Sequence, residues 1–162
     1  MRNSVFLLAC LVLGTALADT RVPNSKVSYN SDMVFIDEQS STGGKTYVAF
    51  VCESYGVAFR LYSKNPLSTE KEFAKSSAMS IIAYADGEKL GYAQGSVRRD
   101  RQTGQLGVWE TTGGLSSALY TAFIDADSSI SVTALRNGYD PVTYRFPTKG
   151  LLTGLKAINY CR

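Results

Sequence analysis

The chain has 162 residues, of which 44% are hydrophobic and 19% are charged, a composition typical of a globular protein rather than a disordered or fibrous one. Its 17 basic and 14 acidic side chains give a net charge of +3, an excess too small to indicate nucleic acid as a partner. Because the sequence contains no histidine, it excludes catalysis that depends on an imidazole and zinc sites with histidine ligands. We expect neither a metal nor another cofactor.

The first 18 residues have the three regions of a secretory signal peptide. Arg2 provides the positive start, Val5 to Leu13 form the apolar stretch, and Ala16-Leu17-Ala18 is a cleavage site of small residues. The apolar stretch is about half as long as a transmembrane helix needs to be, so we predict no stable membrane insertion. We expect cleavage after Ala18 and a location in the periplasm or outside the cell. A lipoprotein signal that ends at Cys10 is the alternative.

Removal of the signal leaves residues 19–162, which we expect to form a single β-rich domain with a loose leader at 19–26. Two cysteines remain, Cys52 and Cys161, in a compartment that permits oxidation. We predict that they form a disulfide, which joins the end of the chain to an early strand. Two free buried thiols are the alternative.

Short apolar or alternating segments predict β-strands along most of the domain, and turn residues separate them. The expected strands span 33–38, 45–53, 57–63, 78–85, 90–97, 105–111, 130–136 and 139–146. Asp86-Gly87 and Asn137-Gly138 predict tight hairpin turns, and Asn-Gly suits both central positions of a type I′ turn, where φ is positive. Pro141 predicts that the last strand lies at an edge of the sheet or carries a bulge.

Three other segments have the signals of helices. Thr69-x-x-Glu72 is a capping-box pattern that predicts a short surface helix from Glu70 to Lys75. Apolar residues recur at helical spacing from Leu115 to Phe123 and from Leu151 to Ile158. We therefore predict a mainly β fold: an antiparallel β-sandwich of about seven strands with two short helices, one of them C-terminal, closed by the disulfide.

The candidate partner-binding site lies at a hairpin tip. Arg98, Arg99 and Arg101 surround Asp100 between two expected strands, and Trp109 lies on the second of these strands. Arginine guanidinium groups and aromatic rings are common at protein and glycan binding surfaces. We therefore assign Arg98, Arg99, Arg101 and Trp109 to this site. The alternative is a solvated tip with Trp109 in the core.

Three carboxylates, Glu53, Asp86 and Glu110, lie near strand ends, and a pair of acids is all that a glycosidase needs. Nothing in their spacing predicts that two of them meet. We therefore expect no enzymatic activity and assign no catalytic residue.

The C-terminal segment carries a longer pattern. Asp140 to Phe146 are followed by Gly150-Leu151 and then by Leu155, Ile158 and Cys161. This arrangement resembles the end of a family of small exported proteins associated with type VI secretion. Those proteins have an early strand with a cysteine, a Phe-x-x-x-Gly-Leu segment that leads into a short helix, and a cysteine that closes the helix. The family often ends in Cys-Gly-Trp, whereas this chain ends in Cys161-Arg162.

The resemblance implies a periplasmic β-sandwich with an accessory, non-catalytic role. We therefore expect an exported periplasmic binding or accessory protein that serves a type VI secretion system. Its partner is expected to be a protein of the cell envelope or peptidoglycan. The alternative is a proteinaceous inhibitor or immunity protein against a cell-wall hydrolase, and a hydrolase that uses two carboxylates is a third class.

Overall fold

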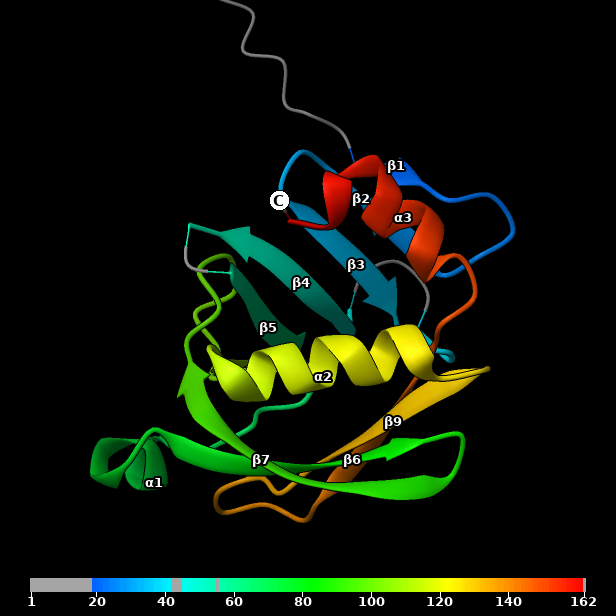
Figure 1. Ribbon diagram of the computed structural model, residues 1–162. Helices are drawn as coiled ribbons and strands as arrows, with labels where there is room; N and C mark the ends of the chain where they lie inside the picture. The colour runs from blue at the N-terminus through cyan, green and yellow to red at the C-terminus, as the bar shows by residue number, and fades with distance from the viewer. Residues whose placement is uncertain (1–18, 42–44, 55, 162) are drawn as a thin grey trace, which may run out of the picture.

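The computed structural model describes residues 19–41, 45–54 and 56–161 (Figure 1). The predicted signal peptide lies outside these residues. The strands are β1 (Thr20–Arg21), β2 (Val27–Tyr29), β3 (Met33–Asp37), β4 (Tyr47–Glu53), β5 (Gly56–Tyr62), β6 (Ala78–Ala85), β7 (Glu88–Arg98), β8 (Val108–Thr111), β9 (Ser129–Ala134) and β10 (Val142–Pro147). The helices are α1 (Glu70–Lys75), α2 (Gly114–Asp125), α3 (Leu151–Ala157) and the 3-10 helix η1 (Asn159–Cys161).

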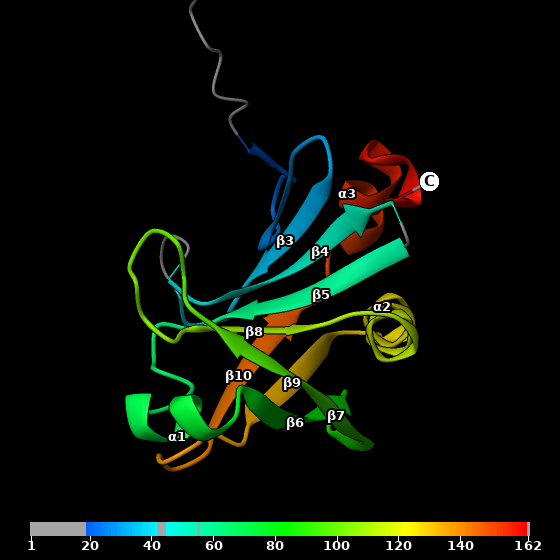
Figure 2. The same cartoon turned by 90° about the vertical axis from the view of Figure 1, so that its left-hand side faces the viewer.

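All the described strands belong to one antiparallel sheet with the order β1-β2-β3-β4-β5-β8-β7-β6-β9-β10. The sheet bends over on itself, so that its β3-β4-β5 half lies across the core from its β6-β9-β10 half (Figures 1 and 2). The two halves meet again where the N–H of Gln39, after β3, donates to the C=O of Arg145 on β10 at 2.8 Å. The predicted mainly β, antiparallel fold is confirmed, and its two layers are the halves of a single sheet. The described residues form ten strands and three α-helices, where about seven strands and two short helices were expected.

Aromatic side chains from both halves and from α2 form the centre of the core. Phe50, Phe59, Phe123 and Phe146 are fully buried, and the ring centroid of Phe123 lies 5.2 Å from that of Phe50 and 6.4 Å from that of Phe146. Helix α2 crosses one side of the bent sheet (Figure 1) and places Phe123 between the two halves. The buried Ser116 hydroxyl fixes the start of this helix, because it donates to a backbone carbonyl of β5 at 2.6 Å.

The C-terminal pattern of the sequence closes the far end of the core. Gly150 has φ of +90° at the start of α3, a conformation that favours glycine. Leu151 and Leu155 are buried where α3 packs on β2 and β3. Cys161 bonds to Cys52 on β4, so the predicted disulfide is confirmed. In this protein the pattern therefore has a structural role.

The segment 19–26, predicted to be a loose leader, is more ordered than the sequence indicates. Thr20–Arg21 pairs with β2, and Val22 is buried in the main core. The Val22 N–H donates to the C=O of Val27 at 2.9 Å. Burial of Val22 beside the start of α3 and an ion pair between Arg21 and Asp37 at 3.2 Å both hold this segment in place.

The predicted tight turn at Asn137-Gly138 is wrong, although β9 and β10 do form a hairpin. Residues 135–141 make a longer connection, because Asn137 bonds to other parts of the chain. Its side-chain amide donates to the C=O of Ala78 at 2.9 Å, its N–H donates to Leu67, and its C=O accepts from Thr69. These tertiary bonds outweigh the local preference of Asn-Gly for a two-residue turn.

Three other local predictions are confirmed. Asp86 and Gly87 have φ of +49° and +95°, as a tight β6–β7 turn requires. The Thr69 side chain caps α1 by accepting from the Glu72 N–H at 3.2 Å. Strand β10, which follows Pro141, is the last strand in the sheet order. No helix in the described part of the chain is long and apolar enough to cross a lipid bilayer.

Candidate functional site: an arginine groove

The loop between β7 and β8 is an ordered turn that lies on the opposite side of the molecule from α2 (Figure 2). The Asp100 carboxylate accepts from the N–H groups of Gln102 at 2.7 Å and Thr103 at 2.9 Å. The Asp100 N–H donates to the C=O of Gln105 at 2.8 Å. Aspartate commonly stabilises turns through such bonds to the following backbone. The arginines beside Asp100 are therefore carried by a well-braced loop.

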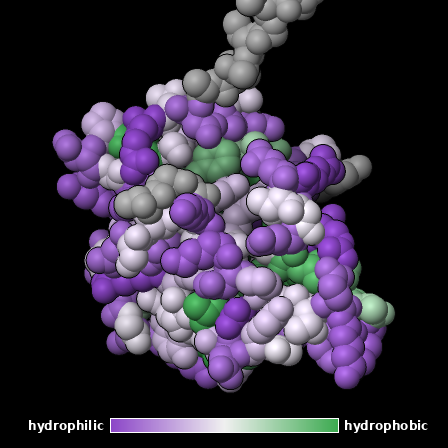
Figure 3. All heavy atoms as spheres, turned by 180° about the vertical axis from the view of Figure 1, so that it is seen from behind, coloured by the Kyte–Doolittle hydropathy of each residue, from purple (hydrophilic) through white to green (hydrophobic). Residues whose placement is uncertain are grey.

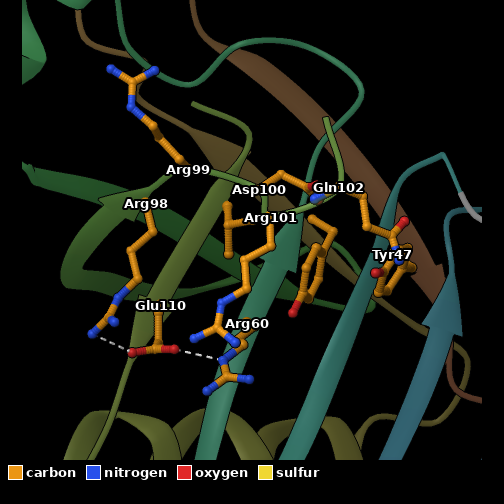
Figure 4. Close-up of a pocket in the computed structure, with 10 residues that line it drawn as sticks. Tyr47, Arg60, Arg98, Arg99, Asp100, Arg101, Gln102 and Glu110 are labelled. Carbon is orange, nitrogen blue, oxygen red and sulfur yellow. Dashed lines mark hydrogen bonds and ion pairs between the residues drawn. The ribbon is translucent and has the colours of Figure 1, made fainter. Parts of the chain in front are cut away.

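A groove of about 480 Å³ lies between this loop and the outer faces of β4, β5 and β8 (Figure 4). We call it the arginine groove. It contains four arginines and two acids, so its net charge is positive. Its lining residues are Tyr47, Arg60, Tyr62, Arg98, Arg99, Asp100, Arg101, Gln102, Val108 and Glu110.

Glu110 on β8 holds two of these arginines in place. The Nε of Arg60 donates to its Oε2 at 2.5 Å, and Nη2 of Arg98 lies 2.7 Å from its Oε1. The Glu110 side chain is only 9% exposed, whereas the Arg98 side chain is 62% exposed. A nearly buried carboxylate needs compensating charges, so Glu110 positions both guanidinium groups. The outer N–H groups of Arg98 face solvent.

Arg101 is the exposed cation of the groove. Its guanidinium points into the groove beside that of Arg60 (Figure 4). Within the described residues no carboxylate or carbonyl pairs with it. Its donors are free for a ligand, and the nearby positive charge of Arg60 favours an anionic one.

Arg99 serves a different purpose from its neighbours. It binds the carboxylate of Glu70 on α1 through two bonds, at 2.9 and 2.6 Å, and its guanidinium lies 5.6 Å from the ring of Phe73. The hydrogen bond from Arg99 lowers the pKa of the Glu70 carboxyl. In Figure 4 the Arg99 side chain points away from Glu110. Arg99 therefore fastens the loop to α1, while Arg98 and Arg101 remain candidates for binding.

Two tyrosines form the other wall of the groove. Tyr47 and Tyr62 face each other across β4 and β5, and their rings stack with centroids 4.4 Å apart. Burial raises the pKa of the Tyr47 hydroxyl, with smaller contributions from Tyr62 and Asp100, so this hydroxyl stays protonated and can donate a hydrogen bond. The half-buried pair presents apolar ring surface beside the cationic groups.

Trp109 does not belong to the binding surface, and this part of the site prediction is wrong. The side chain is fully buried, and its indole N–H donates to the C=O of Met79 at 2.9 Å. Alternation along β8 explains the difference, because Glu110 faces the groove and its neighbour Trp109 must face the core. The alternative that the sequence left open, with Trp109 in the core, is confirmed.

The three carboxylates near strand ends have structural partners. Glu53 and Glu110 both bind Arg60, at 3.1 and 2.5 Å. Asp86 accepts three backbone hydrogen bonds from residues 127–129. In the described ranges no three acidic or cysteine side chains gather as metal ligands would.

Six residues of the groove had no role in the predicted site: Tyr47, Arg60, Tyr62, Gln102, Val108 and Glu110. Arg60 carried a usable signal, since it is a lone charge inside an otherwise apolar strand. Its pairing with Glu110 depends on the contact of β5 with β8, and the two residues are 50 positions apart in the sequence, beyond the reach of local patterns. The pairing register between strands that are far apart in the sequence therefore determines which residues meet in the groove.

The face opposite α2 is mostly hydrophilic, with small hydrophobic areas between the polar side chains (Figure 3). Fold and groove together define a small antiparallel β protein with a cationic groove flanked by tyrosines. The chain matches no family model, no curated protein and no solved structure.

Proposed function

We propose that the protein is an exported, non-catalytic binding module of the periplasm, which recognises acidic groups on an envelope partner through the arginine groove. One observation carries this proposal: Arg101 is exposed and uncompensated, next to two arginines that Glu110 holds in position. Such guanidinium groups bind carboxylates well because their donors are fixed in a planar fork.

Two features support the cellular setting. The signal-peptide pattern indicates export, and disulfides such as Cys52–Cys161 persist in oxidising compartments. The resemblance of the C-terminal segment supports an accessory role in type VI secretion. Of the two partner classes, an envelope protein and peptidoglycan, we favour peptidoglycan because it is a polymer that offers carboxylates repeatedly to one exposed groove.

The direct test is co-sedimentation of the purified protein with peptidoglycan sacculi at low and high salt. We expect the wild type to bind at low salt and to be released at high salt, since exposed charges are screened. Arg101→Ala should weaken binding about tenfold, as expected for loss of a hydrogen bond between charged groups. Lys149→Ala removes an exposed charge outside the groove and is the matched control. Equal binding by wild type and Arg101→Ala contradicts the proposal.

Inhibition of a cell-wall hydrolase is the second candidate function, favoured by the braced loop that carries Arg101. Glycoside hydrolases of this kind present paired carboxylates in an open cleft, and a rigid cationic loop can pair with them. A clearing assay with sacculi and purified hydrolases distinguishes the two functions. An inhibitor abolishes clearing in proportion to its concentration, whereas an accessory binding module leaves the enzyme active.

A further inference from the structure

The arginine groove continues beyond its tyrosine wall. A second hollow of about 280 Å³ shares four lining residues with it: Tyr47, Tyr62, Asp100 and Gln102. This second part is lined by polar and basic side chains, with Lys45 and Lys64 as its cations. Both lysines are exposed. The two hollows form one elongated site with cations at each end and the tyrosine pair between them.

From this layout we infer that the site binds a linear glycan whose sugars carry carboxylates, an inference that rests on the proposed function. Two separated groups of cations match a ligand with repeated negative charges rather than a single small anion. The stacked pair Tyr47 and Tyr62 offers apolar ring surface with hydroxyls at its edge, which suits the mixed apolar and hydroxylated surface of a sugar ring. Gln102, Thr103 and Gln105 add neutral hydrogen-bonding side chains along the rim.

The backbone around the site argues against an extended peptide. The floor is made by β4, β5 and β8, and each of these strands is paired on both sides. Strand β4 pairs with β3 and β5, β5 pairs with β4 and β8, and β8 pairs with β5 and β7. Strand addition needs an unpaired edge whose N–H and C=O groups face the peptide. The backbone N–H and C=O groups of a bound peptide would therefore find no strand edge to pair with and would depend on side chains for hydrogen bonds. A glycan has no such backbone and requires only side-chain donors and acceptors.

The test measures affinity by calorimetry for galacturonic acid oligomers of two and six sugars. The wild type should bind the hexamer at least about tenfold more tightly than the dimer, because a longer oligomer offers carboxylates to both groups of cations at once. Arg101→Ala should weaken binding of both oligomers. The double variant Lys45→Ala, Lys64→Ala should weaken the hexamer about tenfold and leave the dimer unchanged. Lys149→Ala is again the control, and unchanged thermal melting shows that each variant is folded.

Three further ligands identify the source of the carboxylates. Polyglutamate tests an acidic peptide, and dextran sulfate tests general attraction to polyanions. Glycan strands of peptidoglycan from which the peptides have been removed, so that the lactyl carboxylates of the sugars are free, test the envelope glycan. The inference is supported if the galacturonic acid hexamer or the peptide-free glycan strands bind more tightly than polyglutamate and dextran sulfate. The glycan that binds more tightly of these two then identifies the source of the carboxylates. Equal or tighter binding of polyglutamate or dextran sulfate, or loss of the length dependence, overturns it. If Arg101→Ala changes no affinity at all, the proposed function falls as well.

Discussion

Individual acids in this protein act mainly as anchors for backbone or for arginine. Glu110 compensates Arg60 and Arg98 in the groove, and Asp100 braces the loop that carries Arg101. Asp86 has the same role at the other end of the sheet, where it joins the β6–β7 turn to the start of β9. The exposed Arg101 differs from the other three groove arginines, each of which has an acidic partner, and this is why we assign ligand binding to it.

Protonation of the Asp86 carboxylate should destabilise the fold. Its carboxylate accepts from the Ser128 hydroxyl at 2.5 Å and from the N–H groups of Ser128, Ser129 and Asp127. These bonds lower its pKa from 3.8 to about 2, and the Ser128 hydroxyl is the largest cause. A carboxyl with a lowered pKa stabilises the fold above its unfolded pKa and loses that effect as pH falls through its folded pKa. Unfolding free energy should therefore decline between about pH 4 and pH 2.

Urea unfolding of wild type and Asp86→Asn across this pH range measures the effect. The variant should be less stable than wild type at neutral pH, and the difference should shrink as the wild-type carboxylate is protonated. Asp140→Asn, at another exposed acid, is the control and should follow the wild-type curve. A constant difference between Asp86→Asn and wild type down to pH 2 would contradict this account of Asp86.

At the scale of elements, the pairing of β7 with β8 brings the loop arginines to the groove. The two strands pair only from Ser96 to Arg98, and next to this short ladder the Trp109 ring lies directly over Gly95. A Cβ at Gly95 would lie 2.6 Å from the Trp109 ring and would also press on the backbone of Glu110. The absence of a side chain at this position therefore allows the two strands to approach.

Gly95→Ala should destabilise the protein by about 1–3 kcal/mol, the usual cost of overpacking a well-packed site. The single tryptophan of the chain reports this directly, because its fluorescence follows denaturant unfolding. Gly114→Ala is the matched control, since a Cβ there meets no atom within 4 Å. A shift of the unfolding midpoint that is equal in the two variants would mean that contact with Trp109 is not the cause.

Elements formed by neighbouring residues could be predicted from the sequence, whereas contacts between distant elements could not. The β6–β7 turn at Asp86-Gly87 and the cap of α1 at Thr69 depend on a few adjacent residues, and both were recognisable. The Asn137 loop was not, because its conformation depends on bonds to Ala78, Leu67 and Thr69. The sheet order places β8 between β5 and β7, and no local pattern indicates that order.

The same distinction applies to the site. Arg98 and Arg101 could be found because they lie together at one tip of the chain. Arg60 and Glu110 meet only through the register of β5 with β8, and Tyr47 meets Tyr62 only through that of β4 with β5. A sequence can therefore point to the loop of such a groove, but the strands that complete it require the fold.

At the scale of the whole molecule, the disulfide constrains most of the domain. Cys52 and Cys161 are separated by 109 residues, and the chain between them contains β5 to β10 and the three α-helices of the described residues. Closing a loop of this length removes many conformations from the unfolded chain. The bond also holds the end of η1 against β4, next to the helix that covers β2 and β3.

Loss of the bond should lower the unfolding free energy by about 4–5 kcal/mol, as chain-entropy models give for a loop of this length. Urea unfolding of wild type with and without reductant, and of the double variant Cys52→Ser, Cys161→Ser, measures the effect. Reductant should shift the wild-type midpoint and leave the double variant unchanged. Equal midpoints for wild type and double variant contradict the prediction.

Anionic ligands are proposed to bind in the arginine groove, and NMR titration of ¹⁵N-labelled protein with a galacturonic acid hexamer locates the bound ligand directly. We predict saturable shifts in the backbone of residues 98–110 and in the side-chain Nε signals of Arg60, Arg98 and Arg101. Residues of α3, at the opposite end of the core, should not shift. Saturable shifts centred elsewhere, or no saturable shifts at all, would contradict the claim.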